Sequence, residues 1–514
     1  MARMSTAYLL LFSHHTFLRS LQQVQTPMLN CNNGNNFWDL LPDLLRCIMY
    51  ADIKYQNGIG DGVMRSKTDR GGYLFDNKAL VTLIIPLVVE QFLAVLVGMA
   101  DSIMIASVGE AAVSGVSLVD NIMILFINVF AALATGGAVI VGQYLGQRHE
   151  EEACLASTQI VWFGTVIAIG LMTIIYVGKG FILNVVFGEI DADVMSHANI
   201  YLMIVTASVP FIALYNAGAA IFRAMGNSKI SMKVSLLMNF INVVGNAILI
   251  YGFHCGTEGV AIPTLVSRVV AAVIILILLS NQTMTVHIDK TIRFHPDWRM
   301  IKRILRIGVP NGLENSMFQL GKIIILSLVS SFGTYAIAAN AVCNMIAMFE
   351  VLPGMALTLA TTTVIARCVG AGAYDQAKYY TWKLIRITYV GMWMMNALII
   401  LLLPVILRAY NLSDVTAEVT RQIVYFHTIS CVIIWPLSFS IPATLRASGD
   451  AQMTMYISMG SMWVCRIVFS YIFGKYMGMG VFGVWVAMVL DWVVRMILMS
   501  WRYKSGRWML KKVI

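Results

Sequence analysis

Twelve stretches of the chain are long and apolar enough to cross a membrane as helices. Leu, Ile, Val and Met fill windows of about 18 residues or more, which suits a hydrocarbon core roughly 30 Å thick. The pattern therefore predicts an all-α polytopic membrane protein. We expect its spans at approximately 79–106, 117–143, 156–177, 197–222, 232–252, 259–280, 304–328, 338–365, 384–406, 424–445, 454–474 and 481–501.

Residues 1–72 do not follow this pattern. Their apolar patch, in "STAYLLLFSHHTFLRSL", is too short to span a membrane, and "LNCNNGNNFWDL" is polar and rich in Asn. The stretch lacks the ordered basic, apolar and small-residue regions of a secretory signal. We expect 1–72 to be an atypical, disordered extension, of which residues 1–63 are not needed for folding or transport.

The second half of the hydrophobic region repeats the first at an offset of 224 residues. The matched pairs include Pro86 and Pro310, Glu90 and Glu314, Gly109 and Gly333, Gly146 and Gly370, and Gly259 and Gly483. Between "FRAMGN", which ends at Asn227, and "LRASGD", which ends at Asp450, the offset is 223. A duplicated hydrophobic half is typical of transporters with a central binding site.

Counting spans gives the relation between the halves. Each half holds six spans, an even number, so span 7 enters the membrane in the same direction as span 1. The halves are therefore predicted to be parallel lobes related by a pseudo-twofold axis along the membrane normal. We expect an N-lobe at 73–283, a cytoplasmic linker at 284–303, a C-lobe at 304–501 and a basic tail at 502–514.

The charges are few and unevenly placed. Only 12% of residues are charged, against about 25% in a soluble domain. Lys and Arg collect in every second connection and at both ends of the hydrophobic region, which predicts that these face the cytoplasm. The net charge of +10 follows this alternation rather than a basic stripe, so we expect no nucleic-acid partner. The pattern indicates a multi-pass protein of the cell (plasma) membrane.

Charged residues inside the spans are expected to have a structural or functional role, because each costs about 2.5–3.5 kcal/mol of insertion free energy at a helix centre. Glu90 and Asp101 lie 11 residues apart in span 1, so they share a helix face at a separation of about 16 Å. Such a face suits a lobe interior or a cation path. The alternative is that each acid pairs with a base on a neighbouring helix. Glu314 repeats Glu90, but the counterpart of Asp101 is Ile325, so the lobes are chemically unequal.

For the other charges inside spans, structural pairing is the favoured interpretation. Asp491 and Arg495 have the i, i+4 spacing of a helical ion pair, and Lys322 is placed to reach the membrane interface. The roles of Lys322 and Glu350 stay open. The full set is Lys322, Glu350, Arg268, Arg466, Asp491 and Arg495.

The chain shows no motif for catalysis or nucleotide binding. It contains no P-loop, HExxH or GxSxG sequence, and no Ser-His-Asp set with supporting context. Its cysteines have no CxxC or His-paired spacing. We therefore expect no enzyme activity and no cofactor, and any active transport must draw on an ion gradient.

Several segments resemble one transporter family. "PLVVEQFLAVLVGMADSIMIASVGEAAVSGVSLVDNI" with "ALATGGAVIVGQYLGQ", and "GVPNGLENSMFQLGKIIILSLVSSFGTYAIAANAV", are similar to spans of multidrug and toxic compound extrusion (MATE) transporters, within the MOP flippase superfamily. "AIFRAMGNSKISM" and "ATLRASGDAQM" are similar to the loops after spans 4 and 10. The resemblance covers about 75–500. It implies two six-helix lobes, alternating access, and H⁺- or Na⁺-driven export of amphipathic, often cationic, compounds.

The resemblance also suggests an ion site in the first lobe. Asp101 lies where the family places its span 1 acid, and Asn246 lies where some members have a second acid. Sodium-dependent members also use acids in spans 7 and 10, but span 10 here has none, and we do not equate Glu314 with the span 7 acid. We therefore expect ion coupling at Asp101, Asn246 and Glu90, with Na⁺ as one candidate ion at Asp101.

The remaining expectations concern substrate and partners. The cavity candidates are Asn216, Gln91, Asn121 and Glu314. The expected partners are small amphipathic molecules and the lipid bilayer, for a monomeric transporter. The alternative function is a lipid-linked precursor flippase of the same superfamily, which the acidic spans disfavour because such proteins have a strongly cationic cavity. An intramembrane enzyme or a receptor is disfavoured by the missing catalytic set and by the parallel duplication.

Overall fold

The computed structural model describes residues 73–188, 190–288, 296–410, 412–511 and 513–514. They belong to one compact unit, Asp61–Ile514, and the prediction of an extension at 1–72 lies outside the described residues. Every regular element in the described residues is helical.

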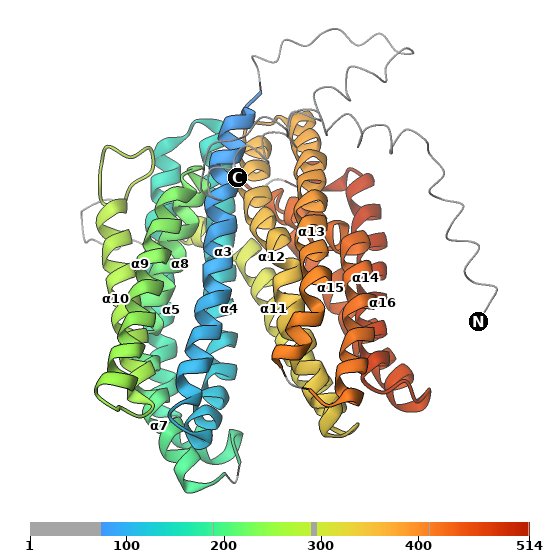
Figure 1. Ribbon diagram of the computed structural model, residues 1–514. Coiled ribbons are helices and arrows are strands. Elements are labelled where there is room, and N and C mark those ends of the chain that lie inside the picture. The colour runs from blue at the N-terminus through green and yellow to red at the C-terminus, as the bar shows by residue number, and fades with distance from the viewer. Residues whose placement is uncertain (1–72, 189, 289–295, 411, 512) are drawn as a thin grey trace, which may run out of the picture. The chain divides into compact units, whose positions relative to one another are not determined.

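The first six predicted spans correspond to the helices coloured blue to green in Figure 1. The fourth span is a bent pair, α7 and α8, with 45° between the two helices. Pro210 lies in the first turn of the second helix, and it has no N–H to continue the hydrogen-bond ladder of the first. The elements are α3 (Asn77–Ala106), α4 (Glu110–Gln147), α5 (Glu150–Val177), α6 (Lys179–Phe181), η4 (Ile182–Val186), α7 (Ala192–Ala207), α8 (Val209–Ala224), α9 (Ser228–Ala247), η5 (Ile248–Gly252) and α10 (Glu258–Leu279).

The last six predicted spans correspond to the helices coloured yellow to red. Span 11 is interrupted by two π-helical segments, η6 and η7, which make each turn wider than an α-helical turn. The elements are α11 (Trp298–Ser330), α12 (Thr334–Gly370), α13 (Tyr374–Ala409), α14 (Asp414–Ala447), α15 (Ala451–Ser461), η6 (Met462–Val468), η7 (Tyr471–Tyr476), α16 (Gly480–Lys504) and η8 (Arg507–Leu510).

The predicted fold class is confirmed. Among the described residues, ten helices are long and apolar enough to span a membrane, and the bent pair makes an eleventh. The predicted seventh span is α11, whose basic first turns make it less apolar than the others. The helices extend several residues beyond the predicted spans, because hydrophobic windows mark only the part that lies in the lipid core.

Each lobe has its own apolar core. In the N-lobe, α3, α4, α7 and α10 contribute residues such as Met123, Leu202 and Ala261. In the C-lobe, α12, α13, α14 and α16 contribute residues such as Met392, Cys431 and Trp492. The two cores share no residue, so each lobe is packed around its own centre.

The lobes meet through residues that the repeat relates to each other. Gly146 in α4 and Gly370 in α12 are repeat counterparts, and a side chain on either would overlap the backbone of the other helix. We call this end of the lobes the closed end. Gln143 Nε2 donates to Ala447 O over 2.9 Å, and its counterpart Arg367 donates through Nε to Ala224 O over 3.1 Å. Two such reciprocal contacts place the pseudo-twofold axis between α4 and α12.

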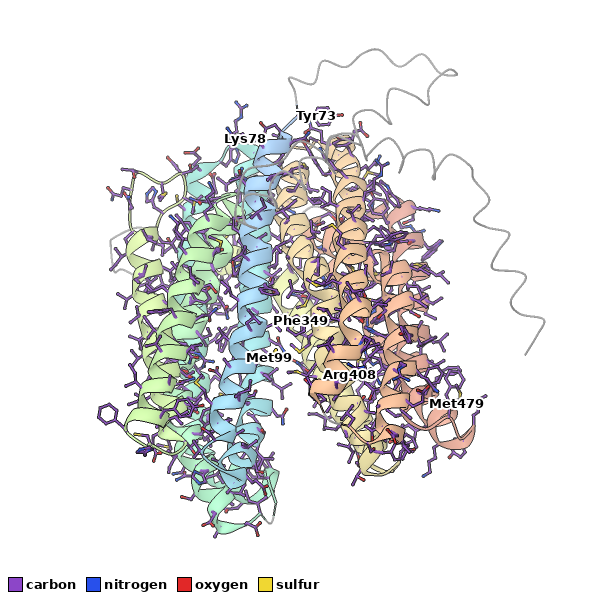
Figure 2. The ribbon with its side chains drawn as sticks, viewed as in Figure 1. Tyr73, Lys78, Met99, Phe349, Arg408 and Met479 are labelled. Carbon is purple, nitrogen blue, oxygen red and sulfur yellow. The ribbon has the colours of Figure 1, made fainter. Side chains whose placement is uncertain are left out.

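The other contacts between the lobes lie on the same side. Lys383 Nζ donates to Asn77 Oδ1 over 2.6 Å at the start of α3. The contact farthest from the closed end is the edge-on pair of Phe92 and Phe349, with ring centroids 6.4 Å apart. Among the described residues, the hydrogen bonds and ring contacts between the lobes stop there. Figure 2 shows α3, which carries Met99, and α12, which carries Phe349, diverging away from the closed end.

We predict that Gly370→Ala will destabilise the protein. The added methyl group would overlap the Gln143 carbonyl, and backbone atoms cannot rotate away. The measurement is the thermal unfolding temperature of purified protein in detergent, with Gly170→Ala as the control because that helix position has open space around it. We expect a drop of several degrees for Gly370→Ala and none for the control. Equal unfolding temperatures for the two variants would contradict this packing.

Candidate functional site

Asp101 lies in the last third of α3, between polar side chains of α9. Asn246 Nδ2 donates to Asp101 Oδ1 over 2.7 Å. Asn242, one helical turn earlier, donates to the same oxygen over 2.9 Å when its amide nitrogen faces the carboxylate, and its own oxygen then accepts from Thr264 Oγ1 over 3.0 Å. Two amides from one helix face therefore hold the carboxylate of Asp101.

A second acid and one base complete the site. Asp120 in α4 and Arg268 in α10 both act electrostatically on Asp101. Asp120 accepts a hydrogen bond from Tyr201 over 3.0 Å, and Arg268 donates to Ser208 over 2.7 Å at the bend between α7 and α8. We call Asp101, Asp120, Asn242, Asn246 and Arg268 the Asp101 cluster. With both carboxylates ionised, its net charge is −1.

The cluster has the chemistry of a cation site. It offers carboxylate and amide oxygens, which are the ligands that hard cations prefer. Asn246 Oδ1 is buried and has no hydrogen-bond partner. A buried acceptor without a donor is unfavourable, and a bound cation would satisfy it. The arrangement therefore fits an ion that neutralises the cluster, either as a proton on a carboxylate or as Na⁺ among the oxygens.

Glu90 and Glu314 are each paired with an arginine. Glu90 lies 3.3 Å from Arg223 and accepts from Ser231 over 2.9 Å, and Glu314 lies 3.3 Å from Arg446. The arginines occupy corresponding places in the "FRAMGN" and "LRASGD" loops. The same ion pair therefore occurs in both lobes, tying span 1 to span 4 and span 7 to span 10. This matches the structural alternative considered for Glu90.

The other predicted site residues lie apart from the Asp101 cluster. Gln91 and Asn216 are half-buried, and Asn121 is exposed beside Asp120. None of the three hydrogen-bonds to the cluster among the described residues. Asn216 Nδ2 is buried and has no hydrogen-bond partner, so it remains a donor available to a ligand.

Sequence reasoning missed Asp120, Asn242 and Arg268 as members of the site. Asp120 lies in the third turn of α4, close to the predicted start of span 2 at residue 117, and Asn242 is neutral. A signal was present in α9, where Asn242 and Asn246 are spaced four residues apart and so share one helix face. Arg268 was recognised as an intramembrane charge, but its neighbours are not evident from spacing.

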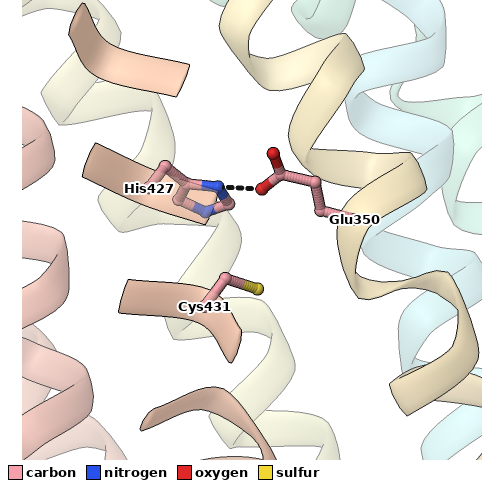
Figure 3. Close-up of side chains that lie close together, drawn as sticks. All are labelled: Glu350, His427 and Cys431. Atoms are coloured by element: carbon pink, nitrogen blue, oxygen red, sulfur yellow. Dashed lines mark hydrogen bonds and ion pairs between the residues drawn. The ribbon is translucent and has the colours of Figure 1, made fainter. Parts of the chain in front are cut away.

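A second buried acid lies in the C-lobe. Figure 3 shows Glu350 of α12 facing His427 and Cys431 of α14. Glu350 and His427 are fully or almost fully buried and hydrogen-bonded through His427 Nδ1, and Thr428 Oγ1 donates to the other carboxylate oxygen over 2.6 Å. The N-lobe counterparts of Glu350 and His427 are Phe126 and Met203.

The donor types of this group are those of a metal site. Ligand atoms of Glu350, His427 and Cys431 lie within 4.8 Å of one another. The carboxylate, however, already accepts from His427 and Thr428, one donor for each oxygen. These contacts favour a structural pair that holds α12 against α14. They give Glu350, whose role was open, a definite partner.

Comparison with known proteins agrees with the two lobes. The sequence model of the MatE family matches the chain twice, at residues 86–248 and 310–472. Both matches begin at the paired prolines of spans 1 and 7. The chain belongs to the MATE family. The predicted resemblance is thus confirmed, and this MATE transporter is a multi-pass membrane protein of a family that handles small molecules, which points away from an enzyme.

Similar proteins cover most of the chain. An uncharacterized transporter of Bacillus subtilis, YisQ, is 28% identical over 445 residues, which is 84% of this chain and 95% of YisQ. A probable multidrug resistance protein of Thermotoga maritima, NorM, is 25% identical over 451 residues, or 85% of this chain and 94% of that protein. An outward-facing structure of a MATE multidrug resistance transporter has a TM-score of 0.79 at 21% identity, covering 84% of this chain and 97% of that one. The structural likeness shows the fold.

We predict that His427→Leu will lower the free energy of unfolding by about 3 kcal/mol or more, because it leaves a buried carboxylate without its partner. Replacing both members, as Glu350→Gln with His427→Leu, should recover part of that loss by removing the charge. Thermal unfolding of the two variants in detergent would measure this. A double variant no more stable than His427→Leu would contradict the structural role of the pair.

Proposed function

We propose that this MATE transporter exports small amphipathic compounds by antiport with H⁺ or Na⁺, and that the ion binds at the Asp101 cluster. The observation that carries the proposal is the geometry around Asp101. Its carboxylate is held by two amides, next to a second acid, and beside a buried acceptor that has no donor. The acidic N-lobe would also suit cationic substrates.

Ion binding would act on the conformational equilibrium through differential affinity. A ligand shifts two states only as far as it binds them unequally. Neutralising the cluster removes an intramembrane charge that is costly to bury. We infer that ion entry from outside favours the conformation that releases substrate there, and that substrate and ion occupy the transporter in turn.

The contacts between the lobes support alternating access by rocking. Because the closed end lies at basic connections such as those carrying Arg148, Lys229 and Lys378, we assign it to the cytoplasmic side. The conformation described here would then face outward. The assignment implies a cell-membrane transporter with both termini in the cytoplasm, and the two complete lobes suffice for a monomer.

Substrate would bind between or within the lobes. Gln91, Asn121 and Asn216 remain proposed cavity residues, and the unpaired amide of Asn216 is the strongest of them. Glu314 is proposed to act through its ion pair with Arg446, which positions span 7. The lipid-linked precursor flippase is not supported by any feature of the Asp101 cluster.

We predict that Asp101→Asn will abolish gradient-driven efflux while the protein still folds. The amide has the shape of the carboxylate but can neither take up a proton nor neutralise Na⁺. The measurement is efflux of a fluorescent amphipathic dye from proteoliposomes, with a pH gradient or a Na⁺ gradient imposed one at a time. Asp375→Asn, which removes an exposed acid outside this cluster, is the control. Full efflux by Asp101→Asn would remove Asp101 from the mechanism.

A further inference from the structure

A cavity of about 280 Å³ lies in the C-lobe between α11, α12, η6 and α16. Its floor is buried and formed partly by Ile325, Asn340 and Trp485. Lys322 and Asn344 line it on the exposed side, and Arg466 reaches it from η6. The remaining lining residues are apolar, so the cavity combines an apolar body with cationic groups.

The repeat shows that this cavity corresponds to the site of the Asp101 cluster. Ile325 is the counterpart of Asp101, and Asn344 is the counterpart of Asp120. Met488, which also lines the cavity, is the counterpart of Thr264. The positions that hold acids in the N-lobe are therefore neutral in the C-lobe. A new cation, Lys322, stands one turn before Ile325, where the N-lobe has Gly98.

The second cation is placed there by a local irregularity in the helix. The repeat offset is 223 before span 11 and 224 after it, so the C-lobe has one extra residue in this span. The π-helical segment η6 accommodates it, whereas the corresponding part of α9 is α-helical. The position of Asn242 then falls on Cys465 or Arg466. Single π-bulges of this kind are frequent at functional sites.

The cations in the cavity are not satisfied by the protein. Arg466 Nε is buried and has no hydrogen-bond partner. Among the described residues, neither Lys322 nor Arg466 forms an ion pair. They share only the ring of Phe318, whose centroid lies 5.5 Å from Lys322 Nζ and 5.1 Å from Arg466 Cζ.

The nearby acid, Asp491, forms an ion pair with Arg495, although neither of its carboxylate oxygens has a hydrogen-bond partner among the described residues. Asp491 lies 3.6 Å from Arg495, as predicted from their i, i+4 spacing, and it acts on Arg466 only at longer range. The four charges Lys322, Arg466, Arg495 and Asp491 therefore sum to +2. Arg466 is half-buried and its Nε atom is fully buried. Burying charge without a partner is unfavourable, so a ligand of opposite charge would stabilise this cavity.

The side-chain amide of Asn340 adds a neutral hydrogen-bond donor to the cavity. Trp485 Nε1 donates to Asn340 Oδ1 over 3.2 Å, which leaves Asn340 Nδ2 without a partner among the described residues. This amide lines the same cavity as both cations. Three residues with donor groups, Lys322, Arg466 and Asn340, thus line a space that Trp485, Met348 and Leu326 also line. A few polar groups in an apolar pocket are what fix the charged end of an apolar molecule.

We propose that the C-lobe cavity binds the anionic group of an amphipathic organic anion, such as a carboxylate on an aromatic body, through Lys322, Arg466 and Asn340. The transporter then carries sites of opposite sign at equivalent positions of its two lobes, with a cation at Asp101 and an organic anion at Arg466. That this anion is a transported substrate rests on the proposed export function. That it binds rests on the cavity alone.

The test is equilibrium binding to the full-length protein in phosphatidylcholine nanodiscs, with no ion gradient. The probe is radiolabelled 2-naphthoate, and 2-naphthylmethylammonium is the competitor with the same body and opposite charge. The variants are Arg466→Gln, Arg466→Lys and Lys322→Gln. Lys475→Gln is the matched control, because Lys475 is an exposed cation on the same span.

We expect saturable naphthoate binding that weakens about tenfold or more in Arg466→Gln and Lys322→Gln. Arg466→Lys should retain part of the affinity, and Lys475→Gln should match the wild type. Because Arg466→Gln removes a half-buried charge that forms no ion pair among the described residues, the variant should unfold at the same or a higher temperature than the wild type. Lost binding would then not reflect misfolding. The ammonium competitor should not displace naphthoate.

Two results would overturn the proposal. One is naphthoate binding that is absent in the wild type or unchanged in Arg466→Gln. The other is displacement of naphthoate when phosphatidylglycerol replaces part of the phosphatidylcholine, which would assign the cavity to a lipid headgroup. Neither result bears on gradient-driven efflux through Asp101, so failure here is distinguishable from failure of the proposed antiport.

Discussion

The cost of burying charge inside a membrane governs where this protein places its ionised side chains. Three acids, Glu90, Glu314 and Glu350, are matched to a base or a histidine within the helix bundle. Such pairs hold helices together but offer little to a ligand. Among the described residues, the Asp101 cluster has a surplus negative charge and the C-lobe cavity has a surplus positive charge. Because their charges are incompletely paired, we propose these two places as binding sites.

The internal repeat supplies a frame whose symmetry is retained where the lobes meet. Gly146 and Gly370 pack against one another as counterparts, and Gln143 and Arg367 make reciprocal bonds across the axis. Because the lobes meet through small residues and single hydrogen bonds, they can separate while both apolar cores stay packed. Symmetry is lost in the lobe interiors, where the chemistry differs. The contact between the lobes is therefore symmetric, while the two lobe interiors differ in charge.

Much of the fold could be predicted from the sequence, because apolar windows and the 224-residue offset are local, additive signals. They gave twelve spans, two parallel lobes and the Asp491–Arg495 pair. The contact of Asp101 with Asn246 brings together two residues singled out by resemblance. The partners of Glu90 and Glu314 were not predicted, since Arg223 and Arg446 lie 133 and 132 residues away along the chain. Residues that pair over such long separations along the chain produce no periodic pattern in a single sequence.

The C-lobe cavity shows a different limit. The change of offset from 224 to 223 and back was visible, but its meaning depends on where the extra residue sits. Only the backbone shows that it lies in η6, where it brings Arg466 to the cavity. Likewise, the acid of α12 looked like an isolated charge until His427 was found beside it. The sequence shows where the repeat offset changes or where a charge lies inside a span. Only the packing of the helices shows which residues are brought together there.

We propose that ion occupancy of the Asp101 cluster controls the separation of the lobes at the closed end. The direct measurement is the distance between spin labels at Lys229→Cys and Lys378→Cys, in a background without native cysteines, as pH and Na⁺ are varied. In the otherwise unchanged protein, one of the two ions should shift the distance distribution. With Asp101→Asn added, that distribution should no longer respond. An equal response with and without Asp101→Asn would contradict the account.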